Sequence, residues 1–426
     1  MKKLLILTSV RTGGGHVSLT EAVTEQLDRR EDAEYRVVDG FDLMNSAQRW
    51  LLADSYGWIT RRRWMLWLWR LGYRVVEHHP NLSVRIFEHC CRRRFLALQR
   101  EYQPDGILAV NPCFVGSIIN IMKKAGTEVP LLCMQADLLD IPAAWFDRRT
   151  AYNIALTEEA GAYSAQKGIA PERLTVGGFP VRRRFFEKAG GEVRLTPEGD
   201  PREILLMGGA EGAGHFVQAA RELLANTASR VTLLCGRNEK LRGRLEEELT
   251  PRYGERVRVL GFIHNMDEEM QTADLIVMRG SPNSAMEAAA MNRPLMIIDA
   301  LPGQEAHNPR VLESHGLCVY QPDVERLLAV LDGQMRAIDR CANDFAYLND
   351  SLQGREQGSS ATAERLADLM EAVYELEGDE QDEVAGAAEG LLKGLGFRSV
   401  PYSAENSRLF TVLPSKNKTR TLSPAI

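Results

Sequence analysis

The same succession occurs twice in this chain of 426 residues: an apolar run, a glycine-rich turn and a helical stretch. The first copy begins at residue 3 and passes through Gly13-Gly14-Gly15-His16, and the second runs from Glu203–Met207 into a turn that ends at Gly214. A strand that passes through glycines into a helix opens a doubly wound α/β unit. The length suits two domains of about 150–200 residues. We therefore expect two consecutive α/β domains.

A segment with two glycines and a proline, Gly177 to Arg182, separates the two series and is expected to be a hinge. In doubly wound sheets ligands bind beyond the carboxyl ends of the strands, so both halves are expected to face one cleft. The expected strands are residues 3–10, 35–38, 107–110, 131–134 and 151–156, then 203–207, 231–234, 257–260, 275–277 and 295–298. The clearest helices are expected at 216–227, 239–249 and 283–291.

Composition excludes several classes of function. The net charge of −6 argues against nucleic acid as a partner. The seven cysteines form no CxxC pair and no metal-ligand spacing, so we expect no metal site and reduced cysteines in the cytoplasm. The apolar run after Lys3 ends by Arg11 without a cleavage site, which favours a strand over a signal peptide. No run reaches the ~18 apolar residues of a spanning helix, so membrane contact is expected to be peripheral.

Residues 49–100 carry eleven Arg against three acidic residues, and five of the six Trp lie in the same stretch. Trp favours the membrane interface, and each Arg near anionic headgroups contributes about 1 kcal/mol. A core helix whose arginines reach the surface is the alternative. The residues expected to contact the membrane are Arg61, Arg62, Arg63, Trp64, Trp67 and Trp69.

His16 stands at the mouth of the first glycine-rich turn. The glycines allow a ligand to approach the backbone, and the start of the following helix offers free N–H groups. The imidazole of His16 is therefore a candidate base for the proton of an acceptor hydroxyl. A tight turn whose histidine only caps or packs is the alternative.

Three further polar clusters follow strands of the second half. Residues 208–214 have the glycine density of a phosphate-facing turn but lack the Lys-Ser/Thr of a P-loop. In residues 278–284, Asn283 or Ser284 is expected to cap a helix whose start would bind a diphosphate, and Glu287 one turn later could bind a ribose diol. An ordinary first-turn Glu is the alternative for that residue. Residues 301–308 offer amide and carboxylate groups to sugar hydroxyls.

Taken in order, these motifs resemble the group of glycosyltransferase family 28 that contains the monogalactosyldiacylglycerol synthases and the bacterial diglucosyldiacylglycerol synthases. The resemblance covers roughly residues 3–372. Its five signatures are the early GGGH, Gly178-Phe179-Pro180-Val181-Arg182, residues 205–214, Cys235-Gly236-Arg237-Asn238 with residues 261–266, and Glu287 followed by residues 302–305 and Asn308.

The resemblance implies a GT-B fold, in which two Rossmann-like domains face a central cleft. Residues 1–178 would form the acceptor- and membrane-binding domain, and residues 179–340 the nucleotide-sugar-binding domain. Residues 341–375 would be helices that cross back to the first domain. Residues 376–426, first acidic and then polar without a period, are expected to be a mobile tail.

The resemblance also implies the roles of individual residues. His16 and Asp137 would be catalytic on the acceptor side, and transfer would invert the anomeric centre without a metal or another cofactor. The acceptor loop would comprise Gly13, Gly14, Gly15 and Asn111. The donor-binding residues would be Gly208, Gly209, Gly212, Gly214, Arg237, Phe262, Ile263, Asn265, Met266, Ser281, Asn283, Ser284, Glu287, Gly303, Gln304, Glu305 and Asn308.

The chain departs from the family pattern at two places. Relatives usually carry a Lys followed by small residues where this chain has Arg279-Gly280-Ser281-Pro282-Asn283-Ser284. They also tend to have a His-Pro pair after the aspartate, whereas Asp137 is followed here by Pro142-Ala143. These changes touch both the donor side and the acceptor side.

We therefore expect an inverting glycosyltransferase that moves a hexose from a UDP-sugar to diacylglycerol. Its partners would be the UDP-sugar, the lipid acceptor and an anionic membrane, with the protein attached peripherally to the cytoplasmic face. A polyprenyl-linked peptidoglycan precursor as acceptor, and a weakened homologue that only binds UDP-sugar or lipid, are alternatives. The remaining alternatives are a glycosyltransferase that acts on a soluble acceptor and an enzyme with an epimerase-like activity.

Overall fold

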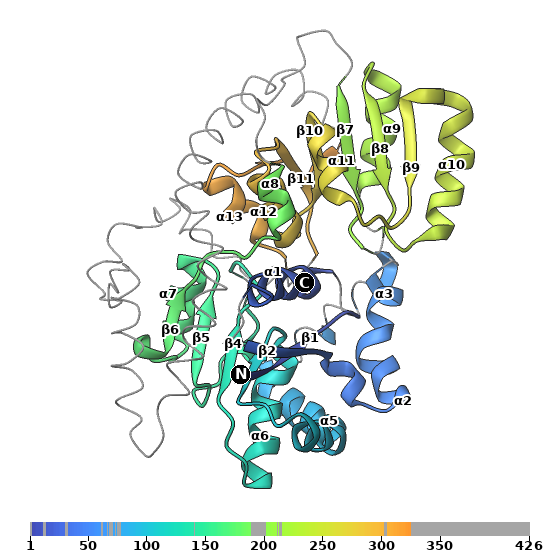
Figure 1. The fold of residues 1–426 in the computed structure, drawn as a ribbon. Helices are drawn as coiled ribbons and strands as arrows, with labels where there is room; N and C mark the ends of the chain where they lie inside the picture. Colours follow the sequence, from blue (N-terminus) through green and yellow to red (C-terminus); the bar gives the residue numbers. More distant parts are fainter. Residues whose placement is uncertain are drawn as a thin grey trace, which may run out of the picture.

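A computed structural model describes residues 2–324, with gaps at 12–13, 30–32, 61–62, 66, 68–70, 73, 75–77, 140, 189–201, 211, 213–214 and 302–304. The chain forms two α/β halves, one above the other in Figure 1. Each half contains a parallel sheet of six strands. The expected C-terminal helices at 341–375 and the expected tail at 376–426 lie outside the described residues.

The first sheet has the order β2-β1-β3-β4-β5-β6. Its strands are β1 (Lys2–Thr8), β2 (Ala33–Asp39), β3 (Gly106–Ala109), β4 (Leu131–Met134), β5 (Tyr152–Ala155) and β6 (Leu174–Val176). The helices of this half are α1 (Gly15–Leu27), α2 (Ser46–Arg49), α3 (Ser55–Thr60), α5 (Pro80–Tyr102), α6 (Val115–Ala125) and α7 (Glu158–Gln166). Strands β3, β4 and β5 are buried along their whole length, because helices cover both faces of a parallel sheet.

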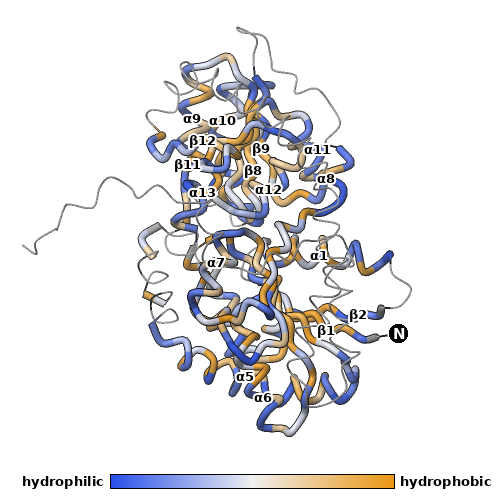
Figure 2. The backbone as a smooth tube through the Cα atoms, turned by 90° about the vertical axis from the view of Figure 1, so that its left-hand side faces the viewer, coloured by the Kyte–Doolittle hydropathy of each residue, from blue (hydrophilic) through white to orange (hydrophobic). Residues whose placement is uncertain are grey.

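The second sheet has the order β12-β11-β10-β7-β8-β9. Its strands are β7 (Glu203–Met207), β8 (Arg230–Leu234), β9 (Val257–Leu260), β10 (Leu275–Arg279), β11 (Leu295–Asp299) and β12 (Val319–Tyr320). The helices are α8 (Arg183–Glu187), α9 (Phe216–Asn226), α10 (Glu239–Tyr253), α11 (Met266–Thr272), α12 (Pro282–Ala290) and α13 (Asn308–Ser314). In Figure 2 the hydrophobic colour follows the strands of both halves.

The strand order reverses once in each sheet. In the first half the chain moves from β1 outward to β2 and then returns to β3 on the other side of β1. In the second half it moves through β7, β8 and β9 and then returns to β10 beside β7. Ligands of doubly wound sheets bind at such switch points, beyond the carboxyl ends of the two strands. The loops after β1, β3, β7 and β10 are therefore where a site is expected.

The two halves meet through α1 and α12, which contact each other and face one another in Figure 1. Leu19 and Val23 of α1 and Ala285 and Ala288 of α12 are all buried and belong to one apolar cluster. The helix start that carries His16 therefore packs beside the helix start that follows β10.

The ten strands expected from the sequence are confirmed, each to within two residues at either end. Strands β6 and β12 were not expected, because three and two residues are too few to show a pattern. Helix α5, with 23 residues, was also missed. Its buried residues Phe87, Cys91, Phe95, Leu98 and Tyr102 recur every three or four positions, but the arginines between them hide that period.

An aromatic cluster joins the outer helices of the first half to its sheet. The rings of Phe41 and Phe114 are 5.2 Å apart, and Phe87 of α5 lies 5.9 Å from Phe41 and 6.1 Å from Phe114, all edge to face. Gly40 is required beside them, because a Cβ there would lie 2.3 Å from the Phe114 ring. The cluster fixes the loop after β3, which carries Asn111.

Replacing Phe114 with Ala is expected to lower the free energy of unfolding by about 3–5 kcal/mol, because a fully buried ring leaves a cavity. Urea unfolding measures the change. Phe262→Ala is the matched control, because that ring is about half exposed and its loss should cost less than about 1 kcal/mol. Equal losses in the two variants would contradict a structural role for the cluster.

Candidate functional site

His16 lies one residue into α1, directly beyond the carboxyl end of β1. Its backbone carbonyl accepts hydrogen bonds from Thr20 Oγ1 at 2.7 Å and from Thr8 Oγ1 at 3.2 Å. The hydroxyl oxygens of Thr20 and Thr8 lie 2.8 Å apart, so two buried hydroxyls hold the backbone of His16. Nothing in the sequence pattern pointed to this pair of threonines.

The His16 imidazole is neutral at physiological pH. Burial lowers its pKa to about 4, against the opposing effect of a hydrogen bond with the Val110 backbone. The Nδ1 atom is enclosed and has no hydrogen-bond partner among the described residues. A neutral imidazole with an unused ring nitrogen can accept a proton, which is what a general base requires.

Asn111 and Asp137 lie at the same edge of the sheet as His16. They follow β3 and β4, and the order β1-β3-β4 places the three loops next to one another. Asn111 Oδ1 accepts a hydrogen bond from the Cys113 amide at 3.0 Å, so its side chain stabilises the loop. The buried carboxylate of Asp137 accepts a hydrogen bond from Trp145 Nε1 at 2.8 Å. Gly14 and Gly15 are described at this edge, whereas Gly13 lies outside the described residues.

The glycines after β7 allow close packing of two loops. Gly212 has a φ of +57°, and a Cβ there would lie 2.3 Å from the Cys235 carbonyl oxygen. The Arg237 amide donates to the Ala210 carbonyl at 2.8 Å, which joins the loop after β7 to the loop after β8. Gly208 and Gly209 belong to the same turn, while Gly214 lies outside the described residues.

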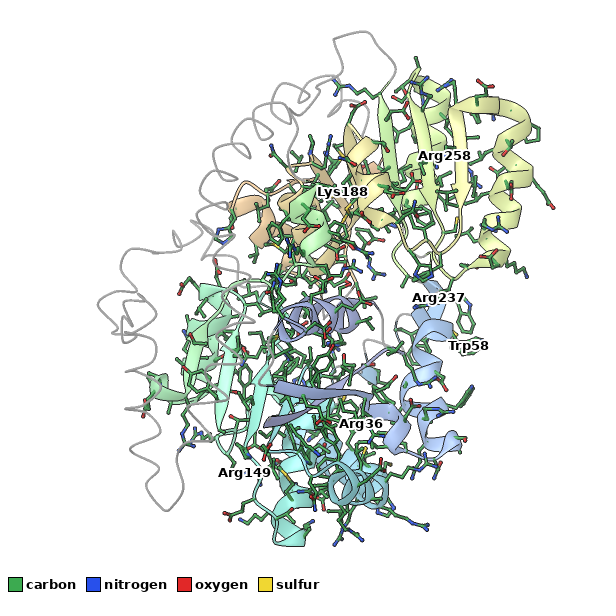
Figure 3. The ribbon with its side chains drawn as sticks, in the orientation of Figure 1. Arg36, Trp58, Arg149, Lys188, Arg237 and Arg258 are labelled. Carbon is green, nitrogen blue, oxygen red and sulfur yellow. The ribbon has the colours of Figure 1, made fainter. Side chains whose placement is uncertain are left out.

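An exposed aromatic ring stands beside these loops. The guanidinium carbon of Arg237 lies 4.7 Å from the centroid of the Phe262 ring. The rings of Phe262 and His264 pack edge to face, with their centroids 5.2 Å apart. Figure 3 shows Arg237 at the lower end of the second half, the end that faces the first. Ile263 is half-buried against the core, and Met266 begins α11 after Asn265. The Phe262 ring is about half exposed, so part of it remains open to a ligand.

The expectation that Asn283 or Ser284 caps α12 is wrong. The helix begins at Pro282 with Ser281 as the N-cap, and no side chain caps it. Asn283 is instead buried against α1: a Cβ on Gly15 would lie 2.6 Å from Asn283 Nδ2. Its Oδ1 atom has no hydrogen-bond partner among the described residues. The start of α12 therefore offers free amides at the junction with α1.

Glu287 is tied to the hinge and to the first half. Its buried Oε1 accepts hydrogen bonds from Arg182 Nη2 at 2.5 Å and Nε at 3.1 Å. Arg182 Nη1 reaches Glu21 Oε2 of α1 at 2.9 Å. Burial raises the pKa of Glu287, and the charge of Arg182 works against that rise. Sequence reasoning placed Arg182 in a motif but did not assign it to the site, because its partners lie far along the chain.

Glu305, the other carboxylate expected to bind the donor, is also paired with an arginine. Glu305 Oε2 lies 2.9 Å from Arg279 Nε and accepts a hydrogen bond from the Leu301 amide at 2.9 Å. Asn308 Nδ2 donates to the Gly280 carbonyl at 3.2 Å. Arg279 and Asn308 thus connect the loops after β10 and β11. Gly303 and Gln304 lie outside the described residues.

The tryptophans of the Arg-rich segment point to solvent. Trp50, Trp58, Trp64 and Trp67 are 62%, 51%, 70% and 57% exposed, and Figure 3 shows Trp58 projecting from α3 at the edge of the molecule. For these four residues the reading as a core helix is wrong. Arg61, Arg62 and Trp69, and the side chain of Arg63, lie outside what the structure describes.

No described helix is both long and apolar enough to cross a bilayer. Within the same residues, no group of three or more His, Cys, Asp or Glu is arranged to hold a metal ion.

Replacing Arg182 with Gln is expected to lower the free energy of unfolding by about 3–5 kcal/mol, because Glu287 would remain buried without its cation. The pKa of Glu287 should rise further in the variant. A carboxyl whose folded pKa lies above its unfolded pKa loses stabilising effect as pH rises between the two values. The deficit of the variant should therefore grow from about pH 5 to about pH 8, as measured by urea unfolding.

Glu21→Gln is the matched control, because it removes the other, half-exposed partner of the same arginine. Its cost should stay below about 1 kcal/mol. Comparable losses in the two variants, or a deficit that does not change with pH, would count against a buried charge at Glu287.

Solved structures with the same overall arrangement confirm the fold. The S. aureus MnaA–UDP co-structure has a TM-score of 0.55 at 13% identity and covers 89% of this chain and 98% of that chain. The crystal structure of Acinetobacter baumannii MurG has a TM-score of 0.52 at 13% identity, with coverages of 87% and 99%. The fold is the GT-B arrangement of two Rossmann-like domains.

Two family models match the sequence: monogalactosyldiacylglycerol (MGDG) synthase over residues 16–181, and the glycosyltransferase family 28 C-terminal domain over residues 203–350. A probable chloroplastic monogalactosyldiacylglycerol synthase of Nicotiana tabacum is 30% identical over 336 residues, which cover 74% of this chain and 61% of that protein. The processive diacylglycerol beta-glucosyltransferase of Bacillus licheniformis is 24% identical over 337 residues, with coverages of 77% and 85%. Residues 203–350 therefore belong to the C-terminal domain family of glycosyltransferase family 28, and residues 16–181 belong to the monogalactosyldiacylglycerol synthase family.

Proposed function

We propose that this protein transfers a hexose from a UDP-sugar to the free hydroxyl of diacylglycerol. The observation that carries the proposal is the meeting of two helix starts at the domain junction, His16 on α1 and the uncapped amides of α12. One start supplies a base for an acceptor, and the other supplies a site for a departing diphosphate. The names of the tobacco and Bacillus relatives support a lipid acceptor.

The second domain offers a set of groups that suits a UDP-sugar. Phe262 and the adjacent backbone would hold uracil, and the loop with Gly208, Gly209 and Gly212 would approach the diphosphate together with the start of α12. Glu287 would accept hydrogen bonds from the ribose hydroxyls, and Glu305 would do the same for the sugar. Arg237, Ile263, Asn265, Met266 and Asn308 would complete this half of the site.

The reaction we propose is a single displacement. His16 takes the proton of the acceptor hydroxyl while its oxygen forms a bond to the anomeric carbon of the sugar. The bond from that carbon to the β-phosphate oxygen breaks, so the configuration inverts and UDP leaves with the electron pair. The backbone amides of Asn283 and Ser284, in the first turn of α12, would stabilise the charge that develops on the phosphate. No metal or other cofactor takes part in this proposal.

A diacylglycerol acceptor stays in a bilayer, so the enzyme would work at a membrane surface. The exposed Trp50, Trp58, Trp64 and Trp67 have the amphipathic rings that favour the interface, and the neighbouring arginines suit anionic headgroups. We propose peripheral attachment to the cytoplasmic face of the cell membrane through this segment.

A UDP-sugar-binding protein without transferase activity is the second candidate. Arg182 pairs with Glu287 and Arg279 pairs with Glu305, so both carboxylates proposed for the donor already have a cation. A protein that bound the nucleotide-sugar through groups other than these two carboxylates would fit these contacts. The transfer assay below separates the two functions.

The proposed function predicts transfer of radiolabel to lipid when the protein meets anionic vesicles containing diacylglycerol. UDP-glucose, UDP-galactose and UDP-N-acetylglucosamine are supplied in separate reactions, and one of them is expected to give a labelled glycolipid. Vesicles without diacylglycerol are the control. Intact UDP binding without any labelled product would favour the second candidate.

His16→Ala is expected to lower turnover by roughly a hundredfold or more and to leave UDP affinity near normal. Because the pKa of His16 is about 4, the base is already deprotonated at neutral pH. The acid limb of kcat/KM against pH should therefore lie well below the pKa of about 6.5 of a free histidine. His89→Ala, at an exposed histidine of α5, is the control. Undiminished turnover in His16→Ala would remove this residue from the mechanism.

A further inference from the structure

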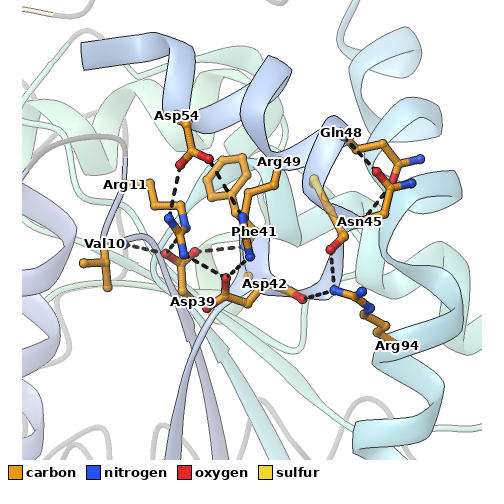
Figure 4. Close-up of polar contacts among 12 residues, drawn as sticks. Val10, Arg11, Asp39, Phe41, Asp42, Asn45, Gln48, Arg49, Asp54 and Arg94 are labelled. Atoms are coloured by element: carbon orange, nitrogen blue, oxygen red, sulfur yellow. Dashed lines mark hydrogen bonds and ion pairs between the residues drawn. The ribbon is translucent and has the colours of Figure 1, made fainter. Parts of the chain in front are cut away.

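A cluster of charges links the chain after β1 to the segment that carries the exposed tryptophans (Figure 4). The guanidinium of Arg11 contacts three carboxylates: Asp42 at 3.0 Å, Asp54 at 3.1 Å and Asp39 at 3.4 Å. These aspartates belong to three different parts of the first half, namely the end of β2, the turn after it and the approach to α3. Arg11 is the group that touches all three.

Other contacts hold most of this cluster in place. Asp39 accepts hydrogen bonds from the Val10 amide at 3.2 Å and the Phe41 amide at 2.9 Å. Arg94 of α5 donates to the Asp42 carbonyl at 2.9 Å. Asp39 and Asp42 are therefore fixed by the sheet and by α5, whatever happens at Asp54.

Asp54 is the carboxylate of the cluster that belongs to the tryptophan-bearing segment. It is the last residue of a π-helix, Trp50–Asp54, that leads directly into α3. The second contact of its carboxylate is longer, 3.8 Å to Arg49 Nε. Trp50 and Leu51 on the π-helix are 62% and 65% exposed, and Trp58 follows on α3. π-Helical turns are rare and occur frequently at functional sites.

Arg11 also belongs to the chain that leads to the proposed base. The chain leaves β1 at Thr8, passes through Arg11 and enters α1 at Gly15, one residue before His16. A shift of Asp54 relative to Asp39 would pull on Arg11 and therefore on the chain that enters α1. The threonine hydroxyls that hold the His16 carbonyl lie on β1 and α1, the two elements that this chain joins.

The environment makes the Arg11–Asp54 pair sensitive to a lipid surface. Both side chains are 32% exposed, so water screens the pair and its contribution is small in solution. When a surface covers the neighbouring tryptophans, less water surrounds the pair and the attraction between its charges increases. Docking would therefore tighten a contact that is weak in the free protein.

We propose that Arg11 is a positioning residue which, through Asp54, couples docking of residues 50–58 on an anionic lipid surface to the placement of α1 and His16. The proposal rests on the proposed function for the role of His16 and for the lipid as occupant of the exposed segment. It adds that lipid contact at one end of the ion-pair cluster reaches the chain at the other end.

Hydrogen exchange of the full chain, with and without vesicles of phosphatidylglycerol and phosphatidylcholine, tests this coupling. In the wild type, vesicles are expected to slow amide exchange in residues 50–60 and also in residues 14–24, the latter by about two- to fivefold. In Asp54→Asn the slowing in residues 50–60 should persist, and the slowing in residues 14–24 should be lost. Arg11→Gln should behave like Asp54→Asn, while Arg11→Lys should recover part of the effect.

Glu101→Gln is the matched control, because it removes another exposed ion pair of the first half, Arg36–Glu101 at 2.8 Å, away from the cluster. It should leave both protections unchanged. Slowing in residues 14–24 that survives in Asp54→Asn, or that never occurs in the wild type, overturns the coupling. Vesicle-free exchange of each variant shows whether it is folded, and Arg11→Lys keeps the test decisive if the neutral variants are not.

The failure of the proposed function would look different. A protein that transfers no sugar from any UDP donor but shows the coupled protection would have the positioning device without the proposed chemistry. A protein that transfers sugar but shows no slowing in residues 14–24 would have the chemistry without the coupling.

Discussion

The junction of the two domains depends on one buried carboxylate, that of Glu287. A carboxylate removed from water is costly unless a cation and hydrogen bonds compensate it, and Arg182 supplies both. The same guanidinium continues to Glu21 on α1, so the compensation of a charge in the second domain requires a residue of the first. The packing of α1 on α12, and with it the position of His16 opposite the start of α12, follows from this arrangement.

Close approach at the junction needs small residues as well as paired charges. Asn283 fits against α1 because residue 15 has no side chain, and the loops after β7 and β8 fit together because residue 212 has none. These glycines had been assigned to ligand binding on the sequence alone. The structure gives them a packing role first, and the same lack of side chains leaves backbone amides accessible where the two halves meet.

The sequence predicted the fold through patterns that are local. The apolar run Leu131–Met134 matched a strand residue for residue, because this buried parallel strand is apolar on both faces. The family resemblance implied that His16, Asn111 and Asp137 serve the acceptor side, and the structure places all three at one sheet edge. The roles of individual residues were harder to predict from the sequence. The capping role of Asn283 was wrong because Pro282 already starts the helix, and the partners of Arg182 and Arg279 depend on how distant loops pack.

The position of Arg182 in the chain has a consequence of its own. Arg182 belongs to the segment that joins the domains, so it never diffuses away from either Glu21 or Glu287 when the domains separate. Its effective concentration at both carboxylates is set by a short tether, and such a tether makes re-formation of a contact far more favourable than the same contact between free groups. Each excursion of the two domains is therefore followed by return to one register, with His16 and the start of α12 brought back to the same relative position.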